Sequence, residues 1–254
     1  MTSRDTVPEM TVSGFHSIKR GIALILLVLL ASVPVPVSAA ESKCPEHFAG
    51  GVAPDLIRQD LNYLAREVCY SGYAVLHSGS TRTPIYTAEH LTRERLLQAR
   101  GVKRSNRFHP DDNIPYPERA ELSDYARSGY DRGHMAPAAD MPDGQSMYES
   151  FSLANMVPQN PTHNRGAWAR VEADVRTMAL ERGQLYVITG PIFADEDQEK
   201  LKGGVRVPGK LFKVLLDQQG NVIKAIQADN SATGESRDIS LAVLEGRTGL
   251  LFSQ

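Results

Sequence analysis

The chain has 254 residues, of which 41% are hydrophobic and 23% charged, a composition ordinary for a globular protein of one large or two small domains. A chain of this length can bury a sizeable core, which excludes a fold that needs a metal ion or a disulfide merely to form. The formal net charge of −2 excludes a protein that holds a polyanion tightly through its overall charge.

The first forty residues are typical of a secretory signal peptide. Two basic residues precede an apolar run over residues 21–33, prolines follow it, and small residues lead up to Ala40. We therefore expect a signal peptide over residues 1–40 and a mature domain over residues 41–254. An uncleaved membrane anchor is the alternative, although a spanning helix needs about 20 apolar residues.

A signal peptide predicts export, so we expect a periplasmic or extracellular protein. Its start codon stays open between Met1 and Met10. Cys44 and Cys69 are its only cysteines, and in an oxidising compartment we expect them to form a disulfide, with two buried thiols as the alternative. No later segment is apolar enough to span a bilayer, so we expect no stable membrane association after cleavage. Residues 1–40 carry three bases and two acids, which leaves the mature domain near −3.

The mature domain opens with a predicted helix over residues 55–67, followed by two paired strands over 70–78 and 83–87. A short helix over 92–99 should begin at Thr92, whose side chain suits an N-cap. A long irregular stretch then covers residues 101–130. Long loops inside compact domains are usually functional or disordered, and this one leads into the most informative segment of the chain, so we favour a functional loop. The basic residues in or beside it include Arg100, Lys103, Arg104, Arg107 and Arg119.

The second half of the chain contains more predicted strands than helices. An amphipathic helix is expected over residues 166–182, ended by Gly183, and the segments 210–216 and 222–227 should form a hairpin. The remaining predicted segments are a short helix or turn over 146–153, strands over 155–157 and 184–189, and the closing pieces 241–245 and 250–252. Strands that connect by short turns predict an α+β fold class: a single domain with a mixed or antiparallel central sheet flanked by helices.

The segment 131–140, Asp-Arg-Gly-His-Met-Ala-Pro-Ala-Ala-Asp, combines a histidine with a cation and two acids. His134 is the side chain suited to accept a proton near neutral pH. In an extended segment, Arg132 and His134 share a face, whereas Asp131 points away from the imidazole. We therefore expect Asp131 to make a salt bridge or a turn contact. Taken alone, His134 would be interpreted as a hydrogen-bonded structural histidine.

A second polar cluster, at residues 155–172, strengthens the catalytic interpretation of the first. Asn164, Trp168 and Glu172 follow each other at helical spacing. The carbonyl of Asn164 could ligate Mg²⁺, which prefers oxygen ligands and keeps several waters, and Glu172 could hold a metal-bound water. The alternatives are an N-cap for Asn164, a solvated helix face for Glu172 and the core for Trp168. A base, a cation and these oxygens are the parts of a metal-assisted phosphodiester hydrolysis.

These two blocks resemble the DNA/RNA non-specific endonuclease family of secreted and mitochondrial nucleases, in the ββα-metal (His-Me finger) group. The resemblance covers nearly all of the mature chain, and the order and spacing match from Arg104 to Glu172. It implies His134 as general base, Asn164 as the one protein ligand of Mg²⁺, with Mn²⁺ or another divalent cation as alternatives, and Glu172 holding a metal-bound water. The matching residues are Asp131, Arg132, Gly133, His134, Ala136, Pro137, Asn155, Pro158, Gln159, Asn164, Trp168 and Glu172.

The resemblance also implies an active-site amide at Asn155, close to the phosphate, and a phosphate-stabilising arginine at Arg104, with Arg107 as its rival. The finger would consist of the His134 strand, the Asn155 strand and the helix over 166–182. The implied activity is cleavage of DNA and RNA through their phosphate backbones with little sequence preference, leaving 5′-phosphate ends. A backbone contact positions a nuclease without base reading.

Two other functions stay open from the sequence: a catalytically silent nucleic-acid-binding protein of the same fold, and a phosphodiesterase that acts on another substrate. The sequence does not settle the oligomeric state, for which a homodimer is one option, the preference between DNA and RNA, or an inhibitor partner. A group of basic residues could follow a phosphate backbone, although such a run is more often a solvated face. Its members are Lys200, Lys202, Arg206, Lys210 and Lys213.

Overall fold

The computed structural model describes residues 42–193 and 199–252. The expected signal peptide over residues 1–40 lies outside the described residues, so its cleavage stays a prediction. Within the described ranges, no helix combines the length and the apolar character that crossing a membrane requires.

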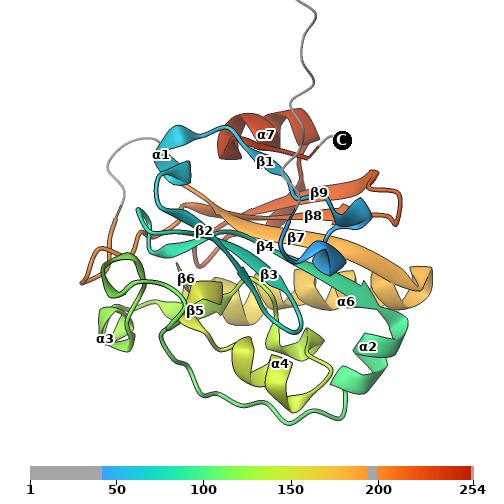
Figure 1. The fold of residues 1–254 in the computed structure, drawn as a ribbon, viewed down its shortest axis with the longest axis horizontal. Helices are drawn as coiled ribbons and strands as arrows, with labels where there is room; N and C mark the ends of the chain where they lie inside the picture. Colours follow the sequence, from blue (N-terminus) through green and yellow to red (C-terminus); the bar gives the residue numbers. More distant parts are fainter. Residues whose placement is uncertain (1–41, 194–198, 253–254) are drawn as a thin grey trace, which may run out of the picture. The chain divides into compact units, whose positions relative to one another are not determined.

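A seven-stranded sheet, in which every neighbouring pair is antiparallel, forms the centre of the domain (Figure 1). The strand order is β10-β9-β8-β7-β4-β3-β2. This confirms the predicted α+β class and, of the two predicted sheet types, selects the antiparallel one. The strands are β2 Ala65–Cys69, β3 Ala74–Ser78, β4 Thr83–Thr92, β7 Gln184–Ile192, β8 Lys210–Leu216, β9 Val222–Asp229 and β10 Ser236–Asp238.

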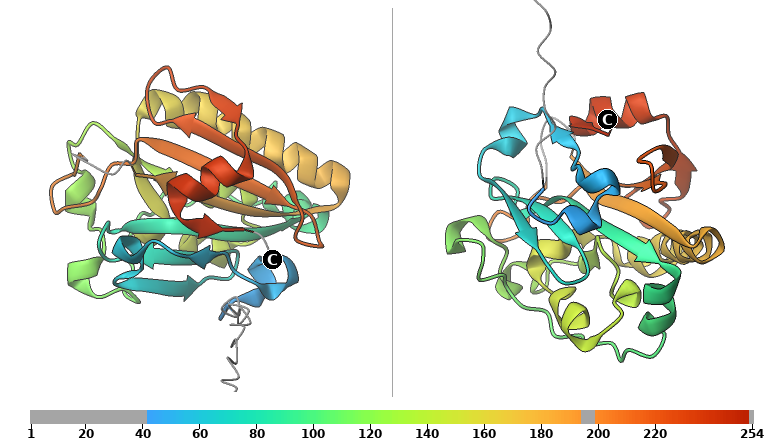
Figure 2. Two further views of the ribbon diagram at one scale, coloured as in Figure 1. Left: turned by 90° about the horizontal axis from the view of Figure 1, so that it is seen from above. Right: turned by 45° about the vertical axis from the view of Figure 1, so that its right-hand side comes forward.

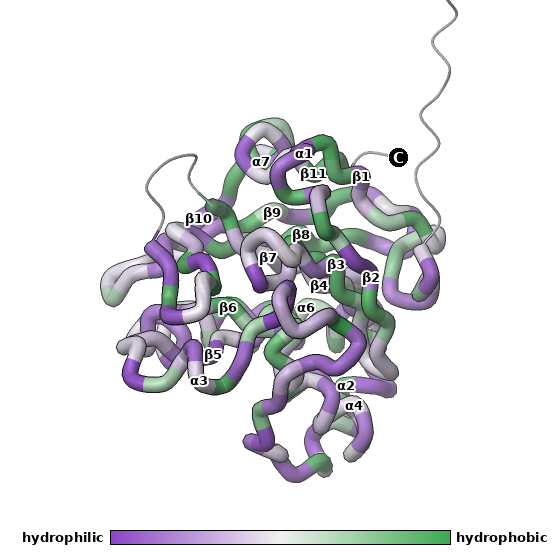
Figure 3. Tube along the Cα trace, turned by 60° about the vertical axis from the view of Figure 1, so that its left-hand side comes forward, coloured by the Kyte–Doolittle hydropathy of each residue, from purple (hydrophilic) through white to green (hydrophobic). Residues whose placement is uncertain are grey.

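Helices cover both faces of this sheet. Because side chains alternate along a strand, β8 sends Leu211 and Leu215 toward helix α6 (Ala169–Arg182) and Phe212 toward the opposite face. Helix α7 (Leu241–Thr248) packs on that opposite face. All views keep α7 and α6 on opposite sides of the sheet (Figures 1 and 2). Hydrophobic stretches follow strands such as β3 and β9, whereas hydrophilic stretches lie around α2 (Arg93–Ala99) and α3 (Leu122–Tyr125) (Figure 3).

A two-stranded antiparallel ribbon and the helix after it form the predicted finger on the α6 side of the sheet. Strand β5 (Asp131–His134) pairs with β6 (Met156–Gln159). The chain then continues through α5 (Pro161–His163) and a π-helical turn (Asn164–Trp168) directly into α6. Gly133 is required in this ribbon, because a Cβ there would lie 2.1 Å from Oε1 of the buried Gln159.

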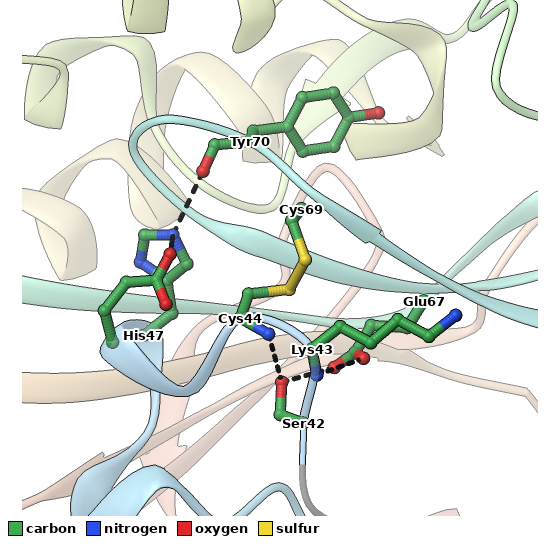
Figure 4. Close-up of a disulfide and its surroundings, with 8 residues drawn as sticks. Ser42, Lys43, Cys44, His47, Glu67, Cys69 and Tyr70 are labelled. Atoms are coloured by element: carbon green, nitrogen blue, oxygen red, sulfur yellow. Dashed lines mark hydrogen bonds and ion pairs between the residues drawn. A yellow bond between two sulfur atoms is a disulfide. The ribbon is translucent and has the colours of Figure 1, made fainter.

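The two ends of the described domain meet in a second small ribbon. Strand β1 (Asp55–Leu56) pairs antiparallel with β11 (Leu250–Leu251). The predicted disulfide is present: Cys44 and Cys69 are bonded, with their Cα atoms 5.6 Å apart, and this ties the entry segment to the end of β2 (Figure 4).

The predicted helix over residues 55–67 is wrong. The segment contains β1, a four-residue helix α1 (Gln59–Asn62) and the beginning of β2. Leu64 has a φ of 63°, which no α-helix can accommodate, and the following residues pair with β3 instead. The predicted strand over 70–78 likewise begins only at Ala74, because the preceding residues form the turn that joins β2 to β3.

The other expected elements are present with shifted ends. Helix α2 begins after Thr92, whose side chain accepts from the Arg95 backbone N–H. Residues 101–130 are irregular except for a 3₁₀ turn (Tyr116–Glu118) and α3. Helix α4 covers Gly144–Glu149. Asn155 ends a 3₁₀ turn (Leu153–Asn155) and lies one residue before β6, so the predicted strand over 155–157 begins late.

Candidate active site

His134 is the last residue of β5 and lies among aromatic side chains. Its ring packs edge-on against Phe151, with 4.9 Å between the centroids, and tilts against Phe108 at 5.8 Å. Only 9% of the residue is exposed, and its Nε2 is buried without a hydrogen-bond partner among the described residues. A buried nitrogen without a partner costs free energy, and in His134 this nitrogen makes no hydrogen bond within the described residues that would compete with a ligand.

Burial lowers the pKa of His134 to about 3, and the positive charges of Arg104 and Arg132 lower it further in the same direction. The imidazole is therefore neutral at pH 7 and has a nitrogen able to accept a proton. Arg132 shares the face of His134, as predicted: its guanidinium carbon lies 4.0 Å from the centroid of the Phe108 ring that also contacts His134.

A cavity of about 680 Å³ brings together most of the predicted site. It lies between the finger and the irregular loop, and four of the five predicted site residues line it. These are Arg104, His134, Asn164 and Glu172. Arg127, Arg132, Arg165 and Asp131 line it as well. The cavity therefore contains four arginine cations, a neutral imidazole, an amide and two carboxyl groups.

Asn164 is held with its amide in one orientation. Its Nδ2 donates to Oδ2 of Asp131 at 3.0 Å, and Asp131 also accepts two hydrogen bonds from Arg165, at 2.6 and 2.8 Å. A carboxylate accepts from the amide nitrogen and not from the amide oxygen, so this contact leaves the Asn164 carbonyl oxygen as the group available to a ligand. Asp131 thus makes the predicted salt bridge away from the imidazole, and it also orients Asn164.

Asn164 does not act as an N-cap, which was the alternative interpretation. The side chain of Asn160 caps α5 by accepting from the backbone N–H groups of Thr162 and His163. Asn164 has helical dihedral angles and opens the π-helical turn. Trp168, four residues further on, is fully buried, as predicted.

Glu172 is half-buried on the first turn of α6 and does not belong to a solvated helix face. Burial raises the pKa of Glu172 to about 7, while Lys213 opposes this rise and Asp140 adds to it. Lys213 is 1% exposed and donates to Oγ1 of Thr189 at 2.7 Å, beneath the ring of Trp168. Lys213 therefore belongs neither to a phosphate-following group nor to a solvated face, the two alternatives that the sequence left open, because it is buried beside Trp168.

A buried charged cluster below the cavity was not predicted. Glu89 and Asp140 are 1% and 2% exposed, and burial raises the pKa of each. Arg95 lies 3.5 Å from the Glu89 carboxylate, and Arg176 donates to Asp140 at 3.1 Å. The sequence contained only two indications of this cluster. Asp140 is the last residue of the 131–140 segment, and Lys213 interrupts an otherwise apolar predicted strand.

The structure distinguishes between Arg104 and Arg107, the two candidates for the phosphate-stabilising arginine. Arg104 lines the cavity, stacks its guanidinium 5.0 Å above the ring of Phe151 and acts electrostatically on His134 and Glu172. Arg107 instead lies 4.9 Å from the ring of Tyr148 and is not part of the cavity lining. The geometry favours Arg104.

Asn155 does not line the cavity, although the resemblance implied an amide close to the phosphate at this position. It is fully buried, its Oδ1 accepts from the Ala136 N–H at 2.8 Å, and its Nδ2 donates to the carbonyls of Ala136 and Ser150 at 2.9 and 3.0 Å. With all its hydrogen-bonding groups bound to backbone, Asn155 holds the chain directly after His134 in place.

The site can accommodate a hard divalent cation with few protein ligands. No group of three or more His, Cys, Asp or Glu side chains with metal-ligand geometry occurs in the part of the chain that the structure describes. The available donors are instead the Asn164 carbonyl oxygen and the Glu172 carboxylate, which suit an ion that keeps most of its water, such as Mg²⁺.

Comparisons with known proteins identify the family to which this fold belongs. The family described as DNA/RNA non-specific endonuclease matches residues 55–254. The chain is 39% identical over 161 residues to "Nuclease 1, mitochondrial" of Schizosaccharomyces pombe, covering 58% of this chain and 50% of the relative. It is 30% identical over 246 residues to "Endonuclease G, mitochondrial" of Bos taurus, covering 89% and 82%.

Among solved structures, a chain of the EndoG/EndoGI complex has the same fold, with a TM-score of 0.66 and 30% sequence identity, over 79% of this chain and 92% of that chain. For Nuclease 1 and the Danio rerio and Xenopus laevis forms of "Nuclease EXOG, mitochondrial", this chain spans only 50–59% of the relative's length.

Proposed function

This chain belongs to the DNA/RNA non-specific endonuclease family, and on that premise we propose that it hydrolyses phosphodiester bonds of DNA and RNA with the aid of a divalent cation. One observation carries the proposal: a neutral histidine, two arginines and an amide oxygen with a fixed orientation line the same cavity. A proton acceptor, positive charge for a phosphate and an oxygen suited to a hard cation in one cavity support metal-assisted phosphodiester hydrolysis.

In this proposal His134 takes a proton from the attacking water. Its low pKa in the substrate-free protein comes from burial and from two neighbouring cations. A phosphate bound between Arg104 and Arg132 would offset their charge and raise the pKa of the imidazole toward the neutral range, where a general base works best. Substrate binding thereby prepares the base.

Asn164 would hold the cation through its carbonyl oxygen, and Glu172 would hold a water bound to that cation. A bound divalent cation, expected to be Mg²⁺, supplies positive charge for the phosphate and the leaving oxygen. Arg104, which also lines the cavity, would bind the phosphate. Asn155 would act only indirectly, by holding the backbone after His134.

The decisive experiment is degradation of plasmid DNA and of RNA by the purified protein with Mg²⁺, with and without EDTA. We expect cleavage that stops with EDTA, and no cleavage by His134→Gln. His90→Gln is the matched control, because His90 stacks on Tyr186 and does not line this cavity. Full activity of His134→Gln would remove His134 as the base, and undiminished cleavage in EDTA would remove the cation.

The same experiment separates the two alternative functions. Binding of DNA without cleavage under every divalent cation tested would favour a catalytically silent nucleic-acid-binding protein. Hydrolysis of small phosphodiesters without cleavage of polynucleotides would favour a phosphodiesterase on another substrate. Since no zinc finger or helix-turn-helix sequence pattern is present, we propose contact with the phosphate backbone alone, which yields little sequence preference.

We further propose that the protein is exported to the periplasm or the medium. The signal-like residues 1–40 and the Cys44–Cys69 disulfide support this, because disulfides persist in oxidising compartments. Cell fractionation with mass spectrometry of the N-terminus tests it. Recovery of an uncleaved chain from the cytoplasm would contradict export.

A further inference from the structure

A second cavity, of about 510 Å³, opens beside the one that contains His134. It lies between α2, α6 and the segment that follows β5. Arg104, Ala138 and Ala139 line both cavities, so the two are neighbouring parts of one surface depression and not separate sites.

The charge of this second cavity is all of one sign. Its charged lining residues, within the described ranges, are Arg100, Arg104 and Arg176, and no acidic side chain lines it. Arg104 forms no salt bridge in the described part of the chain, where its Nε donates to the neutral Asn106. Arg176 is partly neutralised by Asp140 from below. The cavity therefore presents uncompensated positive charge to an anion.

The remaining walls are largely apolar. They are formed by the side chains of Leu96, Val102, Met147 and Leu180. Two exposed positions of α6, Ala173 and Thr177, complete the lining. Arginines around an apolar pocket match a nucleotide, whose phosphate carries charge and whose sugar and base have apolar faces. The volume lies within the usual range of about 300–1,000 Å³ for small-molecule sites.

We propose that the second cavity binds the nucleotide that neighbours the scissile phosphate on the substrate strand. The proposal rests on the proposed function, since it treats the His134 cavity as the place of cleavage. Arg104, on the shared wall, would then lie between the cleaved phosphate and its neighbour. The protein would recognise at least two consecutive nucleotides, without reading which bases they carry.

The test is binding without turnover, measured by fluorescence anisotropy of a labelled single-stranded decanucleotide in EDTA. Ala173→Trp and Thr177→Trp fill the cavity from exposed positions of α6. Each should exclude the nucleotide from the cavity and weaken binding about tenfold, the order of magnitude of the contacts of one base. Ala242→Trp is the matched control, because Ala242 is exposed on α7 and lines neither cavity, and it should bind within twofold of wild type.

Salt dependence supplies an independent measurement. Arg100→Gln should reduce the slope of log affinity against log salt by about 0.7, the value for one phosphate contact on a single strand. Circular dichroism of each variant checks that the fold is retained.

The proposal is overturned if both tryptophan variants bind like Ala242→Trp, or if the Arg100→Gln slope equals that of wild type. Displacement of the probe by inorganic phosphate as efficiently as by an unlabelled dinucleotide would reduce the cavity to an anion site and also overturn it. Failure of the proposed function has a different signature: the wild-type protein would bind the probe in EDTA yet not cleave it when Mg²⁺ is added.

Discussion

Removing the Asp131 side chain should weaken binding of the divalent cation without touching any group that contacts it. Asp131 accepts the Nδ2–H of Asn164 and thereby directs the Asn164 carbonyl oxygen away from itself. In Asp131→Ala the amide can rotate, and its nitrogen can replace its oxygen at the cation. An amide nitrogen is not a ligand for Mg²⁺.

The magnitude follows from the kind of hydrogen bond that is lost. A hydrogen bond to a charged group contributes about 1.5–3 kcal/mol, which corresponds to about a 10- to 150-fold change in affinity. Groups that orient a metal ligand usually alter metal affinity by about 10- to 100-fold, so the two estimates agree. Asp131→Asn keeps a carbonyl oxygen as acceptor and should lose less affinity than Asp131→Ala.

Isothermal titration calorimetry with Mg²⁺ measures this effect independently of activity, and the Mg²⁺ dependence of cleavage measures it again. Arg165→Ala is the control. The Arg165 side chain is 73% exposed, and exposed ion pairs contribute little, so it should change the affinity only slightly. Thermal unfolding of each variant separates a change of affinity from a loss of fold.

Two results would refute the reasoning. Wild-type Mg²⁺ affinity in Asp131→Ala would show that the Asn164 amide is oriented without Asp131. An equal loss in Arg165→Ala would show that the exposed ion pair, and not the contact to Asn164, sets the affinity.

Three further predictions concern stability. Replacing Cys44 and Cys69 by serine opens a loop of 25 residues and should lower the free energy of unfolding by about 3.5 kcal/mol in urea titrations, with cleavage retained under native conditions; an unchanged urea midpoint contradicts this. Lys213→Met removes a buried cation that acts electrostatically on Glu172 and should lower the free energy of unfolding by about 3–5 kcal/mol. Lys210→Met, at a partly exposed ion pair on the same strand, should lower it far less. His134 has a pKa of about 3 in the folded protein and 6.5 in the unfolded chain, so the unfolded chain binds more protons between these values and stability falls as the pH drops from about 6.5 toward 3. His134→Gln should therefore remove about 2.5 kcal/mol of the loss between pH 7 and pH 4.5, and parallel pH profiles of wild type and variant would exclude this assignment.

The separate segments of the finger could be predicted from the sequence because their information is local, whereas their assembly into a finger was implied by the resemblance to the endonuclease family. Residues 131–134 are interpreted as an extended segment, and the apolar residues of the segment that forms α6 repeat at helical spacing. Strand geometry alone also predicts that Asp131 turns away from the imidazole, and the structure confirms its contact with Arg165 instead.

What could not be predicted depends on partners that are distant in the sequence. The segment 55–67 has a helical pattern, but pairing with β3 and the positive φ of Leu64 override it. Lys213 looked like part of a basic surface run, yet β8 lies between β7 and β9 and directs this side chain inward, toward Glu172 and Trp168. Local periodicity cannot indicate which face of a central strand carries a buried cation.

The π-helical turn is the element that joins the two polar residues into one site. In a straight α-helix, residues eight apart are rotated by about 80° from each other, and Asn164 and Glu172 would not face the same direction. A π-helical turn closes its hydrogen bonds over five residues, so each residue advances the rotation by less than in an α-helix. With the turn at Asn164–Trp168, the rotation from Asn164 to Glu172 comes closer to two complete turns, and both side chains line the His134 cavity. Under the proposed function, this irregularity would bring the Asn164 oxygen that ligates the cation into phase with the Glu172 carboxylate that holds its water.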